Sequence, residues 1–200
     1  MEVELLVEGY TDEIFVRRCF DSLGILVGTV YGKQGIFYVI EKAEAFSVRG
    51  DYSPILILAD FADMKIDCVV DARNKLSTKI PEQASVRLAI MEIESWLIAS
   101  RQELARYLGV SIGKISSNPD IIADPKQALI NLARESRYPR IRKMFVPRHG
   151  VSSVVGPGYV DGFTEFMSIH WNIDEAMKYS PSFVRFVTRM REKYCTKLVE

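Results

Sequence analysis

The first half of the chain alternates between short apolar runs and segments whose apolar residues recur at helical spacing. The pattern predicts strands at 3–7, 25–31, 55–59 and 85–90, and helices at 12–22, 36–46 and 69–78. The run at 55–59 is apolar at every position, which is typical of a central strand covered on both faces. Strands joined by helices pair in parallel through right-handed crossovers. We therefore expect an α/β fold with a mainly parallel four-stranded sheet flanked by helices.

The second half of the chain is expected to be helical. Helical spacing predicts helices at about 94–108, 125–136, 160–171 and 182–199, with breaks at 172–174 and 180–181. Asp124 precedes Pro125 and suits the N-cap of the second of these helices. The interpretation is a Rossmann-like core at 1–110 and an α-helical C-terminal extension at 111–200 that packs on the core.

Composition excludes several classes of protein. The 200 residues carry 26 basic and 26 acidic side chains, so no bulk basic field points to nucleic acid. Cys19, Cys68 and Cys195 are too far apart for a metal-binding pair or a disulfide framework. No apolar run approaches the ~18 residues of a membrane span, and the acidic start is unlike a signal peptide. We expect a cytoplasmic protein without a membrane partner.

Acidic residues follow three of the predicted strands. They are Glu8, Asp60 and either Glu92 or Glu94, with Asp63 nearby and Asp12 four residues after Glu8. Parallel strands would gather these carboxylates at one edge of the sheet, where a cation relieves their repulsion. Oxygen ligands suit Mg²⁺ or Mn²⁺, which support phosphoryl chemistry. The alternative is that the same acids cap the helix N-termini beside them.

Two further patterns suit phosphate binding. The turn Gly32-Lys33-Gln34-Gly35 brings glycine amides and one cation together, although an ordinary turn has the same composition. A basic segment from Arg134 to Arg148 could follow a phosphate backbone, or it could be a solvated surface. Its candidate phosphate ligands are Arg140, Arg142, Lys143 and Arg148. The neighbouring His149 has no near His or Cys and is expected to be structural.

The run Leu5-Leu6-Val7-Glu8-Gly9, followed by Asp12 and by a strand that ends at Asp60, resembles the Toprim domain. This topoisomerase–primase fold also occurs in nucleases of the overcoming-lysogenization-defect type, and the resemblance covers about residues 1–95. Three further motifs resemble a bacterial Toprim-like family of unknown function almost from end to end. They lie at residues 89–99, 124–129 and 155–159.

The resemblance implies a Mg²⁺- or Mn²⁺-dependent nuclease, in phage defence or nucleic-acid processing. Glu8 would match the acid/base or ligand of the first strand, and Asp12 the second acid of the nuclease branch. Asp60 would match the first acid of a DxD motif whose second position is Ala62 here, so Asp63 is its candidate replacement. Lys33 would lie in the glycine-bearing turn and contact phosphate.

Two other classes of function stay open. Ala62 suits a non-catalytic module that binds nucleotide, nucleic acid or a partner ATPase. An oligomer-forming domain is suggested by the many apolar residues between Phe183 and Met190, if they form an exposed face. The alternative is that this face is part of the core. The expected partners are therefore nucleic acid or nucleotide, a partner ATPase, and a second copy of the chain.

Overall fold

The computed structural model describes residues 2–76, 84–89 and 92–195. Contacts divide the chain into two compact units: unit 1 contains Met1–Ile90 and Val184–Glu200, and unit 2 contains Met91–Phe183. This division differs from the expected ranges 1–110 and 111–200, because the last helix returns to the sheet. In the part of the chain that is described, no helix is both long and apolar enough to cross a membrane.

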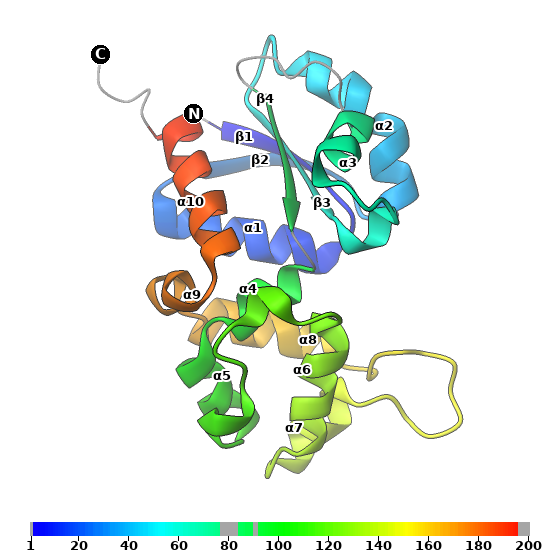
Figure 1. The fold of residues 1–200 in the computed structure, drawn as a ribbon, viewed down its shortest axis with the longest axis vertical. Coiled ribbons are helices and arrows are strands. Elements are labelled where there is room, and N and C mark those ends of the chain that lie inside the picture. The colour runs from blue at the N-terminus through cyan, green and yellow to red at the C-terminus, as the bar shows by residue number, and fades with distance from the viewer. Residues whose placement is uncertain (1, 77–83, 90–91, 196–200) are drawn as a thin grey trace. The chain divides into compact units, whose positions relative to one another are not determined.

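Unit 1 contains a four-stranded parallel sheet in the order β2-β1-β3-β4 (Figure 1). Its strands are β1 (Glu2–Val7), β2 (Leu26–Gly32), β3 (Ile55–Asp60) and β4 (Ala84–Ala89). The central strand β3 is buried at every residue, as its apolar sequence predicted. The α/β class and the parallel sheet are confirmed.

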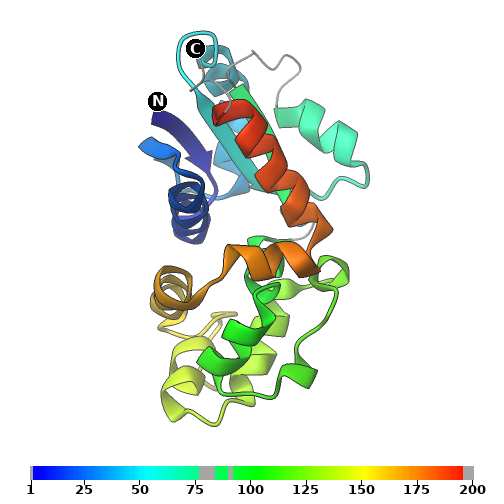
Figure 2. The same cartoon turned by 90° about the vertical axis from the view of Figure 1, so that its left-hand side faces the viewer.

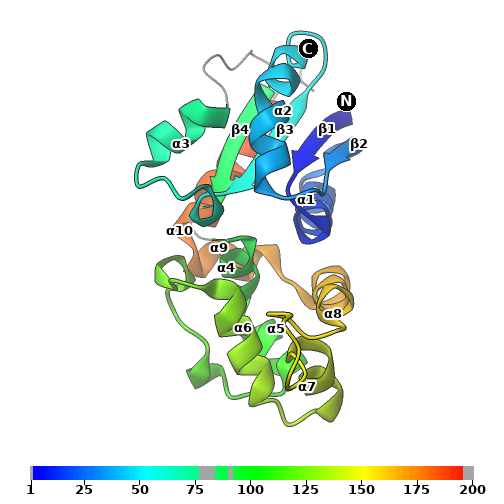
Figure 3. The same cartoon turned by 90° about the vertical axis from the view of Figure 1, so that its right-hand side faces the viewer.

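Helices cover both faces of this sheet. The helices are α1 (Tyr10–Leu23), α2 (Ile36–Arg49), α3 (Val69–Leu76) and α10 (Pro181–Tyr194), with a 3₁₀ turn at Ala62–Met64. Helices α2 and α3 lie on one face (Figure 3), where Val39 and Ala72 join a buried cluster with Leu6 and Ile57 of the sheet. Helices α1 and α10 lie on the other face (Figure 2). Alternate strand residues thus face two different apolar layers.

The apolar side of α10 belongs to the core of the chain, so the core alternative for the residues between Phe183 and Met190 is confirmed and the exposed face is not found. The ring of Phe186 lies 6.1 Å from that of Phe15 on α1, and both residues are buried. The Tyr194 hydroxyl donates to the carbonyl of Ile55 at 2.8 Å. The burial removes the apolar side chains of this face from water and thereby stabilises the fold. Homo-oligomer formation stays a prediction without this surface to support it.

Unit 2 is helical. Its helices are α4 (Ile93–Ile98), α5 (Arg101–Leu108), α6 (Pro125–Arg134), α7 (Pro139–Phe145), α8 (Tyr159–Glu165) and α9 (Ile173–Tyr179), with 3₁₀ turns at Ile112–Lys114 and Pro119–Ile121 and a π-helical turn at Phe166–His170. Its core centres on Phe183, whose ring lies 5.7 Å from Trp96 and 5.5 Å from Trp171. The indole nitrogen of Trp96 donates to Ser182 Oγ at 2.7 Å, which satisfies its polar group.

Two expectations about these helices are wrong. The segment expected as one helix at 94–108 is broken at Ser100, whose side chain bonds across the unit instead: Ser100 Oγ accepts from the Asn172 amide at 3.1 Å. The expected break at 172–174 is the start of α9. Asn172 caps that helix, because its side-chain oxygen accepts from the Glu175 amide at 2.8 Å.

The expected N-cap at Asp124 is confirmed, since Asp124 Oδ1 accepts from the Gln127 amide at 2.7 Å. Asp124→Ala removes that acceptor, so we expect a loss of about 1 kcal/mol in the free energy of unfolding. Asp124→Asn retains an oxygen acceptor and is the matched control. Urea unfolding followed by circular dichroism measures both variants, and equal losses would contradict the capping role.

Candidate functional site

The turn after β1 and the end of β3 form the candidate site of unit 1. Glu8 is 8% exposed and its Oε1 accepts from the backbone amide of Asp60 at 2.6 Å. Asp60 is itself buried. Strands β1 and β3 pair in parallel, so both end at the same edge of the sheet. The structure thus brings together the acids that follow the first and third strands. In open α/β sheets this edge is the usual place for a ligand.

Asp12 is attached to the same turn. It is buried on the first turn of α1, and its Oδ2 accepts from the Gly9 amide at 2.9 Å. The helix begins at Tyr10, two residues before the expected start at residue 12, with Gly9 as its N-cap. Asp12 therefore makes the contact that the helix-capping alternative predicted. Its role as a metal ligand stays a prediction.

The glycine-bearing turn lies directly against the end of β1. The Lys33 amide donates to the Val7 carbonyl and the Gly35 amide to the Glu8 carbonyl, both at 2.9 Å. The Lys33 ammonium lies 3.0 Å from Glu13 Oε2 on α1. These bonds place a cation at the edge that holds Glu8.

Glu13 is a residue of this edge that no sequence pattern singled out. Burial alone would raise the pKa of Glu13, but hydrogen bonds from Arg17 and Lys33, with their charges, outweigh burial and lower it. The only local signal was the spacing of four residues between Glu13 and Arg17, which suits an ion pair on a helix. Its ion pair with Lys33 joins residues 20 apart and has no local signature.

Asp63 differs from the other candidate acids, because it is exposed on the 3₁₀ turn Ala62–Met64. Among the described residues, no group of three or more acidic, His or Cys side chains is arranged to hold a metal ion. Mg²⁺ requires fewer protein ligands than that, since one or two carboxylates with waters and substrate phosphates commonly hold it. Metal binding by Glu8 and Asp60 stays a prediction.

Glu92 and Glu94 belong to unit 2 and contact two distant segments there. Glu92 accepts from both the amide and the ammonium of Lys126 at 3.0 Å, and thereby caps the start of α6. Glu94 is 1% exposed and its Oε1 accepts from the Tyr159 hydroxyl at 2.8 Å. The three motifs at residues 89–99, 124–129 and 155–159 therefore converge on one partly buried cluster.

This cluster makes the stability of the protein depend on pH. Burial, reinforced by the charge of Glu92, raises the pKa of Glu94, although Lys126 and Tyr159 oppose the shift. The folded state then binds this proton more tightly than the unfolded chain, whose carboxyl titrates near pH ~4.3. The stabilisation is present below that pH and is lost as the pH rises toward the folded pKa.

Glu94→Gln retains an oxygen for Tyr159 but cannot titrate. We expect the stability of the wild type, relative to this variant, to fall as the pH rises above about 4.3. Urea unfolding at several pH values between 4.5 and 7.5 measures the difference. Asp161→Asn, at an exposed position of α8, is the control. A wild-type curve parallel to that of Glu94→Gln would contradict the expectation.

The basic candidates lie on or near α7 of unit 2. Arg140 makes two bonds to the Glu165 carboxylate, at 2.6 and 2.8 Å, and these bonds lower the pKa of Glu165. Arg142 donates to the carbonyl of Ser136. Lys143 and Arg148 are exposed, and neither has an ion pair within the described ranges. Two of the four predicted phosphate ligands thus already have protein acceptors.

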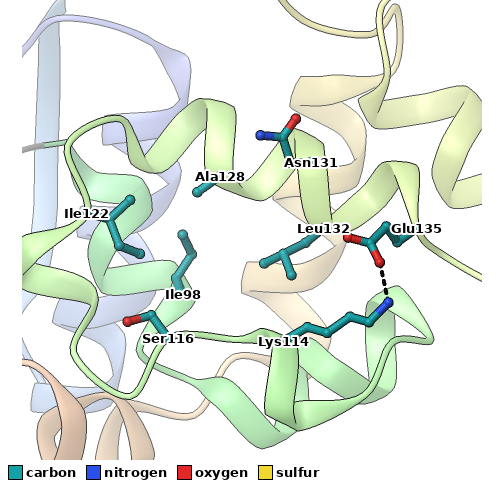
Figure 4. Close-up of a pocket in the computed structure, with 8 residues that line it drawn as sticks. All are labelled: Ile98, Lys114, Ser116, Ile122, Ala128, Asn131, Leu132 and Glu135. Carbon is teal, nitrogen blue, oxygen red and sulfur yellow. Dashed lines mark hydrogen bonds and ion pairs between the residues drawn. The ribbon is translucent and has the colours of Figure 1, made fainter.

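Unit 2 also contains a pocket that the sequence did not indicate. Its volume is about 350 Å³, and Figure 4 shows Ile98, Ile122 and Leu132 directed into it. Lys114 pairs with Glu135 at one side. None of the predicted site residues lines it. Its apolar residues have the spacing of ordinary core positions, so no local pattern distinguishes them.

Comparisons with protein-family models, with curated proteins and with solved structures found no match to this chain. The fold itself is established at the level of class. This chain has an α/β fold with a four-stranded, all-parallel sheet of order 2-1-3-4, flanked by helices, and a helical second part.

Proposed function

We propose that this chain is a Toprim-like phosphodiesterase that depends on Mg²⁺ or Mn²⁺ and acts on nucleic acid. The supporting observation is the hydrogen bond of 2.6 Å from the Asp60 amide to Glu8 Oε1. The bond holds the Glu8 carboxylate against the backbone of Asp60, a second buried acid, at the carboxyl ends of adjacent parallel strands, where such folds bind ligands. The Toprim assignment itself rests on the motif at residues 5–12 and on the strand that ends at Asp60.

The residues of this edge have separate roles in the proposed reaction. A bound Mg²⁺ or Mn²⁺ would polarise a phosphate oxygen and activate water. Asp60 and Asp12 would hold the ion, and Glu8 would act as acid/base or as a further ligand. Lys33 would exchange its ion pair with Glu13 for a substrate phosphate, since both are anions of similar hydrogen-bonding geometry.

Outside this edge the proposal assigns phosphate contacts and a cellular setting. Lys143 and Arg148, with Arg140 and Arg142, would contact phosphates of a longer nucleic acid. Asp63 would join the acids only after a shift of its turn. The family resemblance suggests action in phage defence or nucleic-acid processing, and the cysteine pattern suggests the cytoplasm.

Incubation of the purified full chain with single- and double-stranded DNA and RNA tests the activity. We expect cleavage in Mg²⁺ or Mn²⁺, its loss when EDTA removes the ion, and its return when the ion is restored. Cleavage that EDTA leaves undiminished would contradict the proposal. The assay includes both DNA and RNA because the proposal specifies neither the sugar nor the base.

A non-catalytic module is the second candidate function, and two observations favour it. Ala62 stands where the family motif has a second acid, and the described residues hold no group of three possible metal ligands. Such a module would bind nucleotide, nucleic acid or a partner ATPase. Calorimetric titration separates the two: oligonucleotide binding without measurable Mg²⁺ or Mn²⁺ binding favours the module.

A further inference from the structure

A basic pocket in unit 1 is lined by residues of α3, α10 and the edge strand β4. Figure 1 shows where these three elements lie. Its volume is about 370 Å³. It is lined by Val69 and Arg73 of α3, by Val86, Arg87 and Leu88 of β4, and by Arg189 of α10. Three arginines thus line one pocket, although they come from three separate elements of the fold.

Arg87 is the residue that most requires a partner here. It is half-buried, and its Nη1 donates to the carbonyl of Val86 at 2.9 Å. Its buried Nε makes no hydrogen bond to any residue that the structure describes. A buried donor without an acceptor is costly and uncommon in a folded protein. Arg87 lines the pocket, so a small movement of its side chain would bring this nitrogen to an anion bound there.

The charges around the pocket also favour a bound anion. Arg73 is exposed and has no ion pair within the described ranges, whereas Arg189 pairs with Glu192 at 2.8 Å. The three arginines and this one glutamate leave a net charge of +2. Burial lowers the pKa of Arg87, and Arg73 and Arg189 lower it further, although Tyr194 and Glu192 oppose them. An anion would remove the repulsion among the arginines.

We propose that this pocket binds a phosphate monoester. Its charge of about −1.5 to −2 at neutral pH matches the net charge of the pocket better than a single carboxylate or a phosphodiester does. Guanidinium groups also fit phosphate oxygens in pairs. Val69 and Leu88 add an apolar wall for the body of the ligand, and the volume is within the usual range for small-molecule sites.

This inference goes beyond the proposed function, because it uses none of the acids near Glu8 and holds with or without cleavage. Its structural alternative is that the arginines protect an edge strand from pairing with another chain. The two explanations predict different results. A ligand site shows saturable binding of phosphate, whereas arginines that protect the edge strand prevent self-association of the chain.

Calorimetric titration of the full chain, without divalent cations and at 0.15 M salt, tests the binding. The probes are inorganic phosphate, adenosine 5′-monophosphate, and adenosine as the control that lacks phosphate. We expect the monophosphate to bind more tightly than inorganic phosphate, and adenosine not to bind. Oligonucleotides with and without a 5′-phosphate show whether the monoester comes from a free nucleotide or from a nucleic-acid end. Absence of binding by every phosphorylated probe would overturn the proposal.

Two variants locate the site. Arg73→Gln removes an exposed charge without disturbing an ion pair within the described ranges, so folding is preserved and affinity should fall at least about tenfold. Arg87→Gln should abolish binding. Lys75→Gln, also exposed on α3 but on another side of it, removes the same charge and should have little effect. Equal weakening by Lys75→Gln and Arg73→Gln would overturn the proposal, as would self-association of Arg73→Gln with phosphate affinity unchanged.

Discussion

Glu8→Gln is expected to lower the rate of metal-dependent phosphodiester cleavage by about 100-fold or more, the contribution typical of a positioned acid or base. The amide keeps an oxygen that accepts from the Asp60 amide, as Glu8 Oε1 does at 2.6 Å. Stability should therefore change little, while the negative charge and the titrating proton are both lost. Cleavage is followed in Mg²⁺ and Mn²⁺, and thermal unfolding of the same sample checks the fold.

Glu41→Gln is the matched control, because Glu41 is exposed on α2 and undergoes the same chemical change. It should cleave at the wild-type rate. Equal cleavage by wild type and Glu8→Gln would refute the assignment and would point to a contaminating nuclease. A loss of activity accompanied by a large fall in melting temperature would show a structural role for Glu8 instead.

Gly32→Ala is expected to lower the free energy of unfolding by about 3 kcal/mol or more, because a left-handed backbone and a steric overlap both oppose it. Gly32 has a φ of +94°, and an added Cβ would lie 2.0 Å from the carbonyl oxygen of Val7. Since β1 and β2 pair at this point, the overlap cannot be relieved without opening the sheet. Activity should fall as well, because the adjacent Lys33 amide bonds to the same carbonyl.

Gly24→Ala separates the two causes. Gly24 has a φ of +69°, but an added Cβ would meet nothing within 4 Å. It should therefore cost only the backbone strain, about 1 kcal/mol. Urea unfolding at fixed pH measures both variants. Equal losses would show that the overlap with Val7 does not contribute to the loss of stability. Cleavage assays on Gly24→Ala should give wild-type rates.

Local patterns predicted the first half of the chain well. The four strands and the helices between them depend on periodicity and on glycine or proline breaks, which neighbouring residues impose. The second half was less predictable. Ser100 Oγ accepts from the Asn172 amide, 72 residues away, and the Asn172 side chain caps α9. The local sequence does not distinguish a polar side chain that makes a distant bond from one that caps a helix. The missed α9 and the false continuous helix at 94–108 have this common cause.

The candidate site divides in the same way. The sequence alone indicated that Glu8 and Asp60 end their strands, since an apolar run followed by an acid is a local feature. Only the tertiary structure determined that the Asp60 amide donates to Glu8, that Glu13 pairs with Lys33, and that Glu94 is buried against Tyr159. Arg73, Arg87 and Arg189 likewise share a pocket without any sequence signal. Residues so distant along the chain meet because the sheet order and the helix packing bring them together, and that arrangement is a property of the whole fold.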